Sequence, residues 1–139
     1  MYLIDTNVIS EARKKSGADP GVRRFFADVT ARSEPVYLSV VTIGELRRGI
    51  ELIRHRGDLP QALRLESWLQ VVLTDYSDRI LPLDEEIAQI WGRLRVPHPE
   101  HALDKQIAAT ALLYGLTVVT RNQHDFKATS VDVLNPFEM

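Results

Sequence analysis

Short apolar segments alternate with segments of helical periodicity along this sequence, and this alternation limits the folds that the chain can adopt. The short segments are rich in Val, Ile and Leu and span 1–4, 36–41, 79–83, 116–120 and 131–134. The longer segments carry apolar residues three and four positions apart, as amphipathic helices do, and span 20–31, 42–54, 62–72, 85–96 and 103–114. Strands that alternate with helices predict an α/β fold with a mostly parallel sheet and helices on both faces.

The composition is typical of a soluble globular protein and excludes several kinds of site. A chain of 139 residues is expected to form one domain, 1–139, with a substantial hydrophobic core. There is no cysteine, which excludes disulfides, thiol nucleophiles and thiolate metal sites and fits a reducing compartment. We find no segment apolar and long enough to span a membrane and no signal peptide. The expected location is therefore cytoplasmic.

The charge of the chain gives no general attraction to nucleic acid, because the formal net charge is −2. Arginine, however, supplies 13 of the 17 basic residues. Its planar guanidinium suits phosphate contacts and base stacking better than a lysine ammonium does. A genome rich in arginine codons explains the bias equally well, so charge alone does not decide the partner.

Acidic and amide residues lie where the predicted strands end. Asp5 ends the first apolar segment, and Glu45 lies in the first turn of the helix predicted after the second segment. Asp104 opens the helix before the fourth segment, and Asn122 and Asp125 follow that segment. Ligands bind at the carboxyl ends of the strands in open α/β sheets, so we expect these side chains to share one edge.

Oxygen ligands of this kind suit Mg²⁺ or Mn²⁺, and such a site can hydrolyse phosphodiesters through an activated water. Each acid also has a purely structural explanation, because Asp and Glu are favoured at helix N-termini. Thr42 and Glu45, three residues apart, fit a capping box. The residues alone leave a metal site and a set of helix caps both open.

Two other residue types are expected to be structural. His98 and His101 precede Asp104, but their spacing fits no helix-based pair of metal ligands, and we expect them to be exposed loop residues. Trp68 and Trp91 lie on apolar stripes of predicted helices. Packing in the core or in a dimer contact is therefore expected for them, rather than stacking on bases.

Four motifs resemble those of PIN-domain ribonucleases. They are YLIDTNVISE at 2–11, SVVTIGEL at 39–46, DKQIAATA at 104–111 and VTRN at 119–122 with the following Asp125 and Phe126. Their order and spacing are similar, over essentially the whole chain, to those of VapC-type toxins of bacterial toxin–antitoxin pairs, including the FitB-like members. The resemblance implies a three-layer α/β/α fold with a sheet of four to five strands. It also implies a Mg²⁺- or Mn²⁺-dependent endoribonuclease.

The resemblance further implies roles for individual residues. Asp5 and Asp104 would bind metal, and Glu45 would complete a catalytic acidic triad as a ligand or by orienting the attacking water. The fourth acidic position of the family falls on Asn122, which brings no charge, so one firmly bound metal is expected. Asp125 could partly replace the missing acid, but a surface cap before Phe126 is the favoured explanation of this residue. Three hydroxyl residues at the same edge would support the acids, namely Thr6, Ser39 and Thr120. Two arginines, Arg121 and Arg47, would contact RNA.

The implied partners are a structured RNA substrate such as tRNA, a cognate antitoxin protein and a second copy of the chain in a homodimer. An alternative function is a non-catalytic binding module that uses the same acidic edge to hold a partner. A DNA-directed nuclease is a third reading, which we rank lower because the short chain has no added domain to hold DNA.

Overall fold

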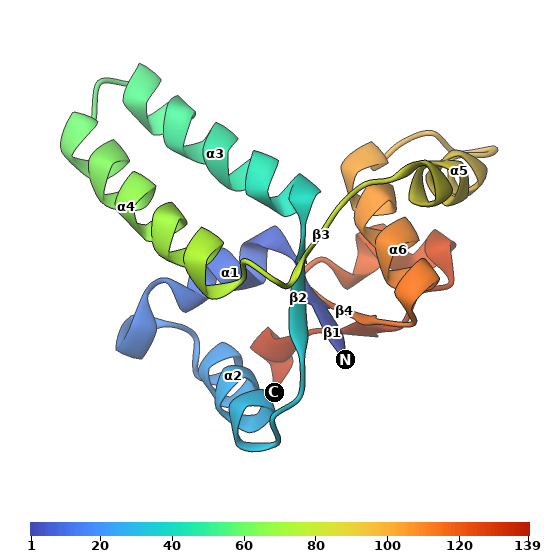
Figure 1. The fold of residues 1–139 in the computed structure, drawn as a ribbon, viewed down its shortest axis with the longest axis horizontal. Helices are drawn as coiled ribbons and strands as arrows, with labels where there is room; N and C mark the ends of the chain where they lie inside the picture. The colour runs from blue at the N-terminus through green and yellow to red at the C-terminus, as the bar shows by residue number, and fades with distance from the viewer.

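The computed structural model describes residues 1–139 and contains a five-stranded sheet flanked by helices (Figure 1). The strands are β1 (Tyr2–Ile4), β2 (Val36–Ser39), β3 (Ile80–Leu81), β4 (Thr117–Val119) and β5 (Val133–Leu134). The α-helices are α1 (Thr6–Ala12), α2 (Pro20–Ala31), α3 (Val40–His55), α4 (Leu59–Asp75), α5 (Glu85–Leu94) and α6 (Ala102–Tyr114). Three 3-10 helices complete the chain: η1 (Lys15–Gly17), η2 (Gln123–Thr129) and η3 (Pro136–Glu138).

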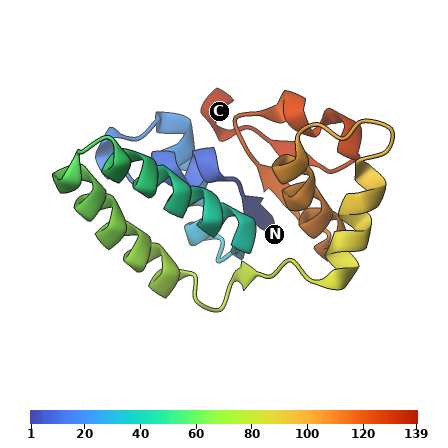
Figure 2. The same cartoon turned by 90° about the horizontal axis from the view of Figure 1, so that it is seen from above.

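All neighbouring strands are parallel, and their order in the sheet is β3-β2-β1-β4-β5. The helices α1 to α4 lie on one side of the sheet, and α5 and α6 lie on the other (Figures 1 and 2). The predicted three-layer α/β/α fold with a mostly parallel sheet is confirmed. Pro82 directly follows β3, which is an edge strand, as a proline next to a short strand predicts.

The central strand β1 divides the hydrophobic core, because successive side chains of a strand point to opposite faces. Ile4 packs in a cluster with residues of α1 to α4, including Val8 and Phe25. Leu3 packs in a second cluster, with Ile107 of α6 and Phe126 of η2. No helix has both the length and the hydropathy that a membrane span requires.

Two predicted boundaries were wrong. β2 ends at Ser39, and the Ser39 hydroxyl accepts a hydrogen bond from the Val41 backbone N–H at 3.0 Å, so α3 begins at Val40. The predicted capping box of Thr42 and Glu45 is therefore absent, because both residues lie inside the helix. α4 is also longer than the predicted 62–72, since Asp58 caps it and Pro60 falls in its first turn, where proline is tolerated.

Candidate metal centre

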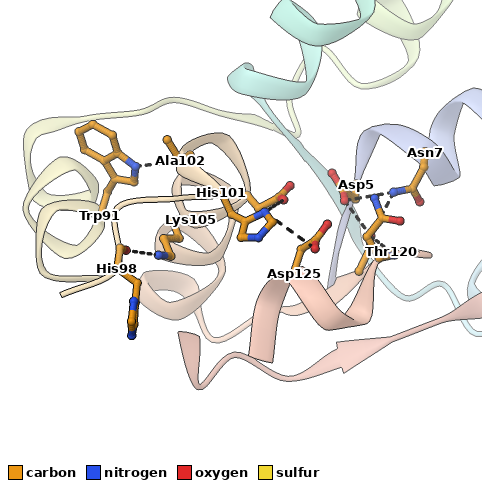
Figure 3. Close-up of polar contacts among 11 residues, drawn as sticks. Asp5, Asn7, Trp91, His98, His101, Ala102, Lys105, Thr120 and Asp125 are labelled. Atoms are coloured by element: carbon orange, nitrogen blue, oxygen red, sulfur yellow. Dashed lines mark hydrogen bonds and ion pairs between the residues drawn. The ribbon is translucent and has the colours of Figure 1, made fainter. Parts of the chain in front are cut away.

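Asp5 lies at the carboxyl end of β1, in the centre of the sheet, and caps α1. Its Oδ1 accepts a hydrogen bond from the Thr6 backbone N–H at 2.8 Å. Its Oδ2 accepts one from the Thr120 hydroxyl at 2.8 Å and one from the Asn7 amide at 3.3 Å (Figure 3). Burial raises the pKa of Asp5, while the hydrogen bonds from Thr120 and Thr6 act to lower it. Asp5 is thus both a helix cap and a carboxylate held in one orientation.

Glu45 reaches the same edge from α3. Its Oε1 accepts a hydrogen bond from the Thr6 hydroxyl at 2.8 Å, which links it to the residue that follows Asp5. The side chain is half-buried, and burial together with repulsion from the Asp5 carboxylate raises the pKa of Glu45. Because Glu45 lies beyond the first helical turn, its carboxylate is not used for capping.

Asp104 and Asp125 approach from the other layer, on the first turn of α6 and on η2. His101 lies between them: its Nδ1 is 3.8 Å from Asp104 Oδ2 and 3.8 Å from Asp125 Oδ1 (Figure 3). One ligand atom from each of the three residues lies within 4.8 Å of the other two. His101 is an exposed loop residue, as predicted, but its approach to Asp104 and Asp125 was not predicted, because a test for helical spacing does not cover contacts that a loop makes.

The carboxylates of Asp5, Glu45, Asp104 and Asp125 lie close enough for Asp104 to be repelled by the other three. The pKa of Asp104 is raised to about 6, first by burial and then by repulsion from Asp5, Asp125 and Glu45. None of the four forms a salt bridge with a lysine or an arginine, and His101 is the sole basic partner of Asp104 and Asp125. Unneutralised oxygen ligands of this type fit a divalent cation such as Mg²⁺ or Mn²⁺.

The other predicted supporting residues differ in what they contact. Ser39 is buried and caps α3, as described above. Thr120 is buried against Asp5, and its oxygen also accepts a hydrogen bond from the Asn122 backbone N–H at 3.0 Å. The Asn122 side chain is exposed and makes no hydrogen bond.

The two predicted RNA-contacting arginines lie in different surroundings. The Arg121 guanidinium stacks over the Phe137 ring, 3.8 Å from its centroid, and forms no salt bridge. The Arg47 guanidinium is already paired with Glu66 at 2.8 Å and with Glu51 at 3.2 Å. An RNA contact by Arg47 would therefore compete with these ion pairs, and it remains a prediction.

Two adjoining hollows lie beside α4, and the first, between α1, α3 and α4, reaches the acidic edge. It measures about 290 Å³ and is lined by Thr6 and Glu45 together with Arg13 and Trp68. The second, of about 360 Å³, shares Arg13 and Trp68 and adds Lys15 and Arg64. Sequence reasoning missed this basic surface, because its residues come from elements that are far apart along the chain.

Comparison with known proteins identifies the family of the chain. The family model described as PIN domain matches residues 2–131. The chain is 39% identical over 144 residues to toxin FitB of Neisseria gonorrhoeae, with 99% of each chain covered. It is 33% identical over 147 residues to VapC ribonuclease Y4jK of Sinorhizobium fredii, again with 99% of each covered. A crystal structure of FitAcB from Neisseria gonorrhoeae superposes with a TM-score of 0.77 at 36% identity, covering 100% of both chains. The chain therefore belongs to the PIN domain family.

Proposed function

We propose that this protein is a divalent-metal-dependent endoribonuclease and the toxin of a toxin–antitoxin pair. The observation that carries the proposal is the convergence of Asp5, Glu45 and Asp104 at one sheet edge without a lysine or arginine partner. Asp5 also caps α1, but Glu45 and Asp104 are neither paired with a lysine or arginine nor used for capping, and both are repelled by the Asp5 carboxylate. The similarity to relatives named toxin FitB and VapC ribonuclease supports the same conclusion.

The acids have distinct roles in this proposal. Asp5 and Asp104 bind Mg²⁺ or Mn²⁺, and the hydrogen bonds from Thr6 and Thr120 fix the direction of the Asp5 carboxylate. A cation held by these two carboxylates would supply Lewis-acid activation of the attacking water and charge stabilisation for the leaving oxygen. Glu45, with its raised pKa, accepts a proton from that water, and the Thr6 hydroxyl orients its carboxylate.

An RNA substrate needs cations for its phosphates as well as an acidic centre. The hollow lined by Glu45 also offers Arg13, and the second hollow adds Lys15 and Arg64. Trp68 lines both hollows but packs against the core, as expected from its apolar stripe. Arginine contacts to phosphate are common in RNA binding. Arg121, which has no carboxylate partner, supplies a further phosphate contact.

Two protein partners follow from a toxin of this kind. A nuclease that cleaves the RNA of its own cell must be held inactive, so a cognate antitoxin is part of the proposal. The hairpin of α3 and α4 exposes Leu52, Leu59 and Leu63, which are 46%, 55% and 60% accessible. Exposed leucines on both helices of this hairpin are consistent with a protein contact, such as the homodimer that the family resemblance implies.

The test is cleavage of a structured RNA by purified, chelator-treated protein with and without Mg²⁺ or Mn²⁺. We expect no product without metal, and at least about a hundredfold loss of rate in Asp5→Asn and Asp104→Asn, because each removes a ligand. Asp78→Asn is the matched control, since Asp78 is an exposed acid outside the centre. Metal-independent cleavage, or unchanged rates in both ligand variants, would exclude the proposal. Cleavage of DNA at a similar rate would instead indicate a general nuclease.

A further inference from the structure

The loop that joins α5 to α6 is held by three side chains, each donating a hydrogen bond to a backbone carbonyl; Figure 3 shows those of Trp91 and Lys105. The Trp91 indole N–H donates to the Ala102 carbonyl at 2.9 Å, and the Arg95 Nε donates to the Pro99 carbonyl at 3.2 Å. The Lys105 ammonium donates to the His98 carbonyl. His101 therefore stands on an anchored loop, although its side chain is exposed.

Lys105 directly follows Asp104 in the chain, but its ammonium is not paired with an acid. It is 3% exposed and forms no salt bridge, and it donates to a backbone carbonyl of the loop instead. Buried charges are ordinarily paired or hydrogen-bonded, and this one is satisfied by the loop. The imidazole of His101 is the one basic group within 4.0 Å of Asp104 and Asp125.

The position of the imidazole fits ligation better than hydrogen bonding. The 3.8 Å between Nδ1 and each carboxylate oxygen is too long for a hydrogen bond. Two ligands of one ion, each at about 2.1 Å, lie between about 3.0 and 4.2 Å apart, depending on their angle. The atoms of His101, Asp104 and Asp125 already lie within 4.8 Å of one another, so small side-chain rotations would bring all three onto one ion.

We propose that His101 is a nitrogen ligand of the metal centre, together with Asp104 and Asp125, and that it makes the centre prefer Mn²⁺ to Mg²⁺. The inference rests on the metal dependence proposed above and goes beyond it by assigning a ligand and an ion preference. Mg²⁺ is a hard cation that takes oxygen ligands, whereas imidazole nitrogen suits first-row transition metals. Replacing one oxygen ligand by nitrogen therefore lowers affinity for Mg²⁺ relative to Mn²⁺.

The test compares His101→Ala with His98→Ala in metal-free protein, by calorimetric titration with Mn²⁺ and with Mg²⁺. His98 is the matched control because it lies in the same loop and its side chain is 70% exposed. We expect His101→Ala to weaken Mn²⁺ binding about tenfold, which corresponds to one lost ligand of about 1.4 kcal/mol. Mg²⁺ binding should change much less, and His98→Ala should change neither.

Pulsed EPR of bound Mn²⁺ provides a direct readout, because nitrogen coordination produces a modulation of the electron spin echo. The wild-type protein should show this modulation and His101→Ala should lack it. Absence of nitrogen coupling in the wild type would overturn the inference. So would an equal loss of affinity for Mn²⁺ and for Mg²⁺ in His101→Ala. Metal-dependent RNA cleavage with no nitrogen coupling would leave the proposed function intact, whereas failure of any metal to bind would remove both.

Discussion

At the scale of single residues, the Thr120 hydroxyl uses its whole hydrogen-bonding capacity at the centre. It donates to Asp5 Oδ2 at 2.8 Å and accepts from the Asn7 amide at 3.1 Å and the Asn122 backbone N–H at 3.0 Å. A hydroxyl has one donor and two acceptor positions, so its orientation is fully determined. Thr120 directly follows β4, so this hydrogen bond fixes the Asp5 carboxylate, at the end of β1, relative to β4.

We predict that Thr120→Val lowers both stability and metal affinity. The change keeps the shape but removes the donor to Asp5 and leaves two N–H groups without their acceptor, which should destabilise the fold by about 1–3 kcal/mol. The looser Asp5 should weaken Mn²⁺ binding about tenfold in a titration of metal-free protein. Thr110→Val is the control, because Thr110 is equally buried but bonds only to the Gln106 carbonyl within α6. Equal metal affinities in the two variants would contradict this role of Thr120.

The raised pKa of Asp104 predicts a particular dependence of stability on pH. Its carboxyl has a pKa of about 6 in the folded protein against 3.8 ordinarily, so the folded state binds this proton more tightly. The resulting stabilisation is fully present below about pH 3.8 and is lost as the pH rises through about 6.

The melting temperature of metal-free protein should therefore fall between pH 5 and pH 7 by roughly 2–5 °C more than that of Asp104→Asn. The two proteins should be compared by differential scanning calorimetry in a chelating buffer. Parallel curves for the two proteins would show that Asp104 does not titrate in this range.

Much of the centre could be predicted from the sequence, because the edge at which parallel strands end is set by topology. Asp5, Glu45 and Asp104 follow from that rule, and the structure brings all three to one edge. The exposed loop position of His101 was predicted, but its approach to Asp104 and Asp125 was not, because that approach depends on a loop held by Lys105 and Trp91, contacts that no local pattern encodes. The pairing of Arg47 with Glu66 is likewise set by how α3 packs on α4.

At the scale of elements, the first residue of a helix could be predicted where one candidate N-cap residue precedes it. It could not be predicted where the sequence offers two candidate N-cap residues. Asp19 and Asp84 cap α2 and α5, and each is the one capping residue directly before the first residue of its helix. Before α3, Ser39 and Thr42 are both good caps, and the earlier one is used because β2 ends there. The shift places Glu45 in the second turn, where its side chain is available to the centre.

The contact between α2 and η3 depends on a glycine. A Cβ on Gly21 would lie 2.0 Å from the Pro136 carbonyl oxygen, which is backbone and cannot rotate away. We predict that Gly21→Ala detaches η3 and destabilises the protein by about 2 kcal/mol or more in urea unfolding. Gly92→Ala, on an exposed part of α5 with nothing within 4 Å, should instead be neutral or stabilising by about 0.5–1 kcal/mol. Equal effects of the two changes would contradict the close packing at Gly21.

At the scale of the whole molecule, the centre joins the two helical layers. Asp5 and Glu45 belong to the layer of α1 and α3, while Asp104 and Asp125 belong to the layer of α6 and η2. The repulsion that raises the pKa of Asp104 comes from both layers, and it opposes their close approach at this edge. A cation at the centre would replace this repulsion by attraction and would tie the layers together.

A ligand that binds only the folded protein stabilises it by about 2.7 kcal/mol at a concentration of 100 times Kd. For a chain of this length we therefore predict that saturating Mn²⁺ raises the melting temperature by on the order of 10 °C. Asp5→Asn and Asp104→Asn should lose most of this increase, and Asp78→Asn should retain it. A binding module that uses the acidic edge only to hold a basic partner needs no ion, so it predicts no increase for any of the four proteins. Each ligand variant removes one carboxylate from the centre and so weakens cation binding there. A rise in melting temperature that survives in both variants would therefore place the bound ion elsewhere.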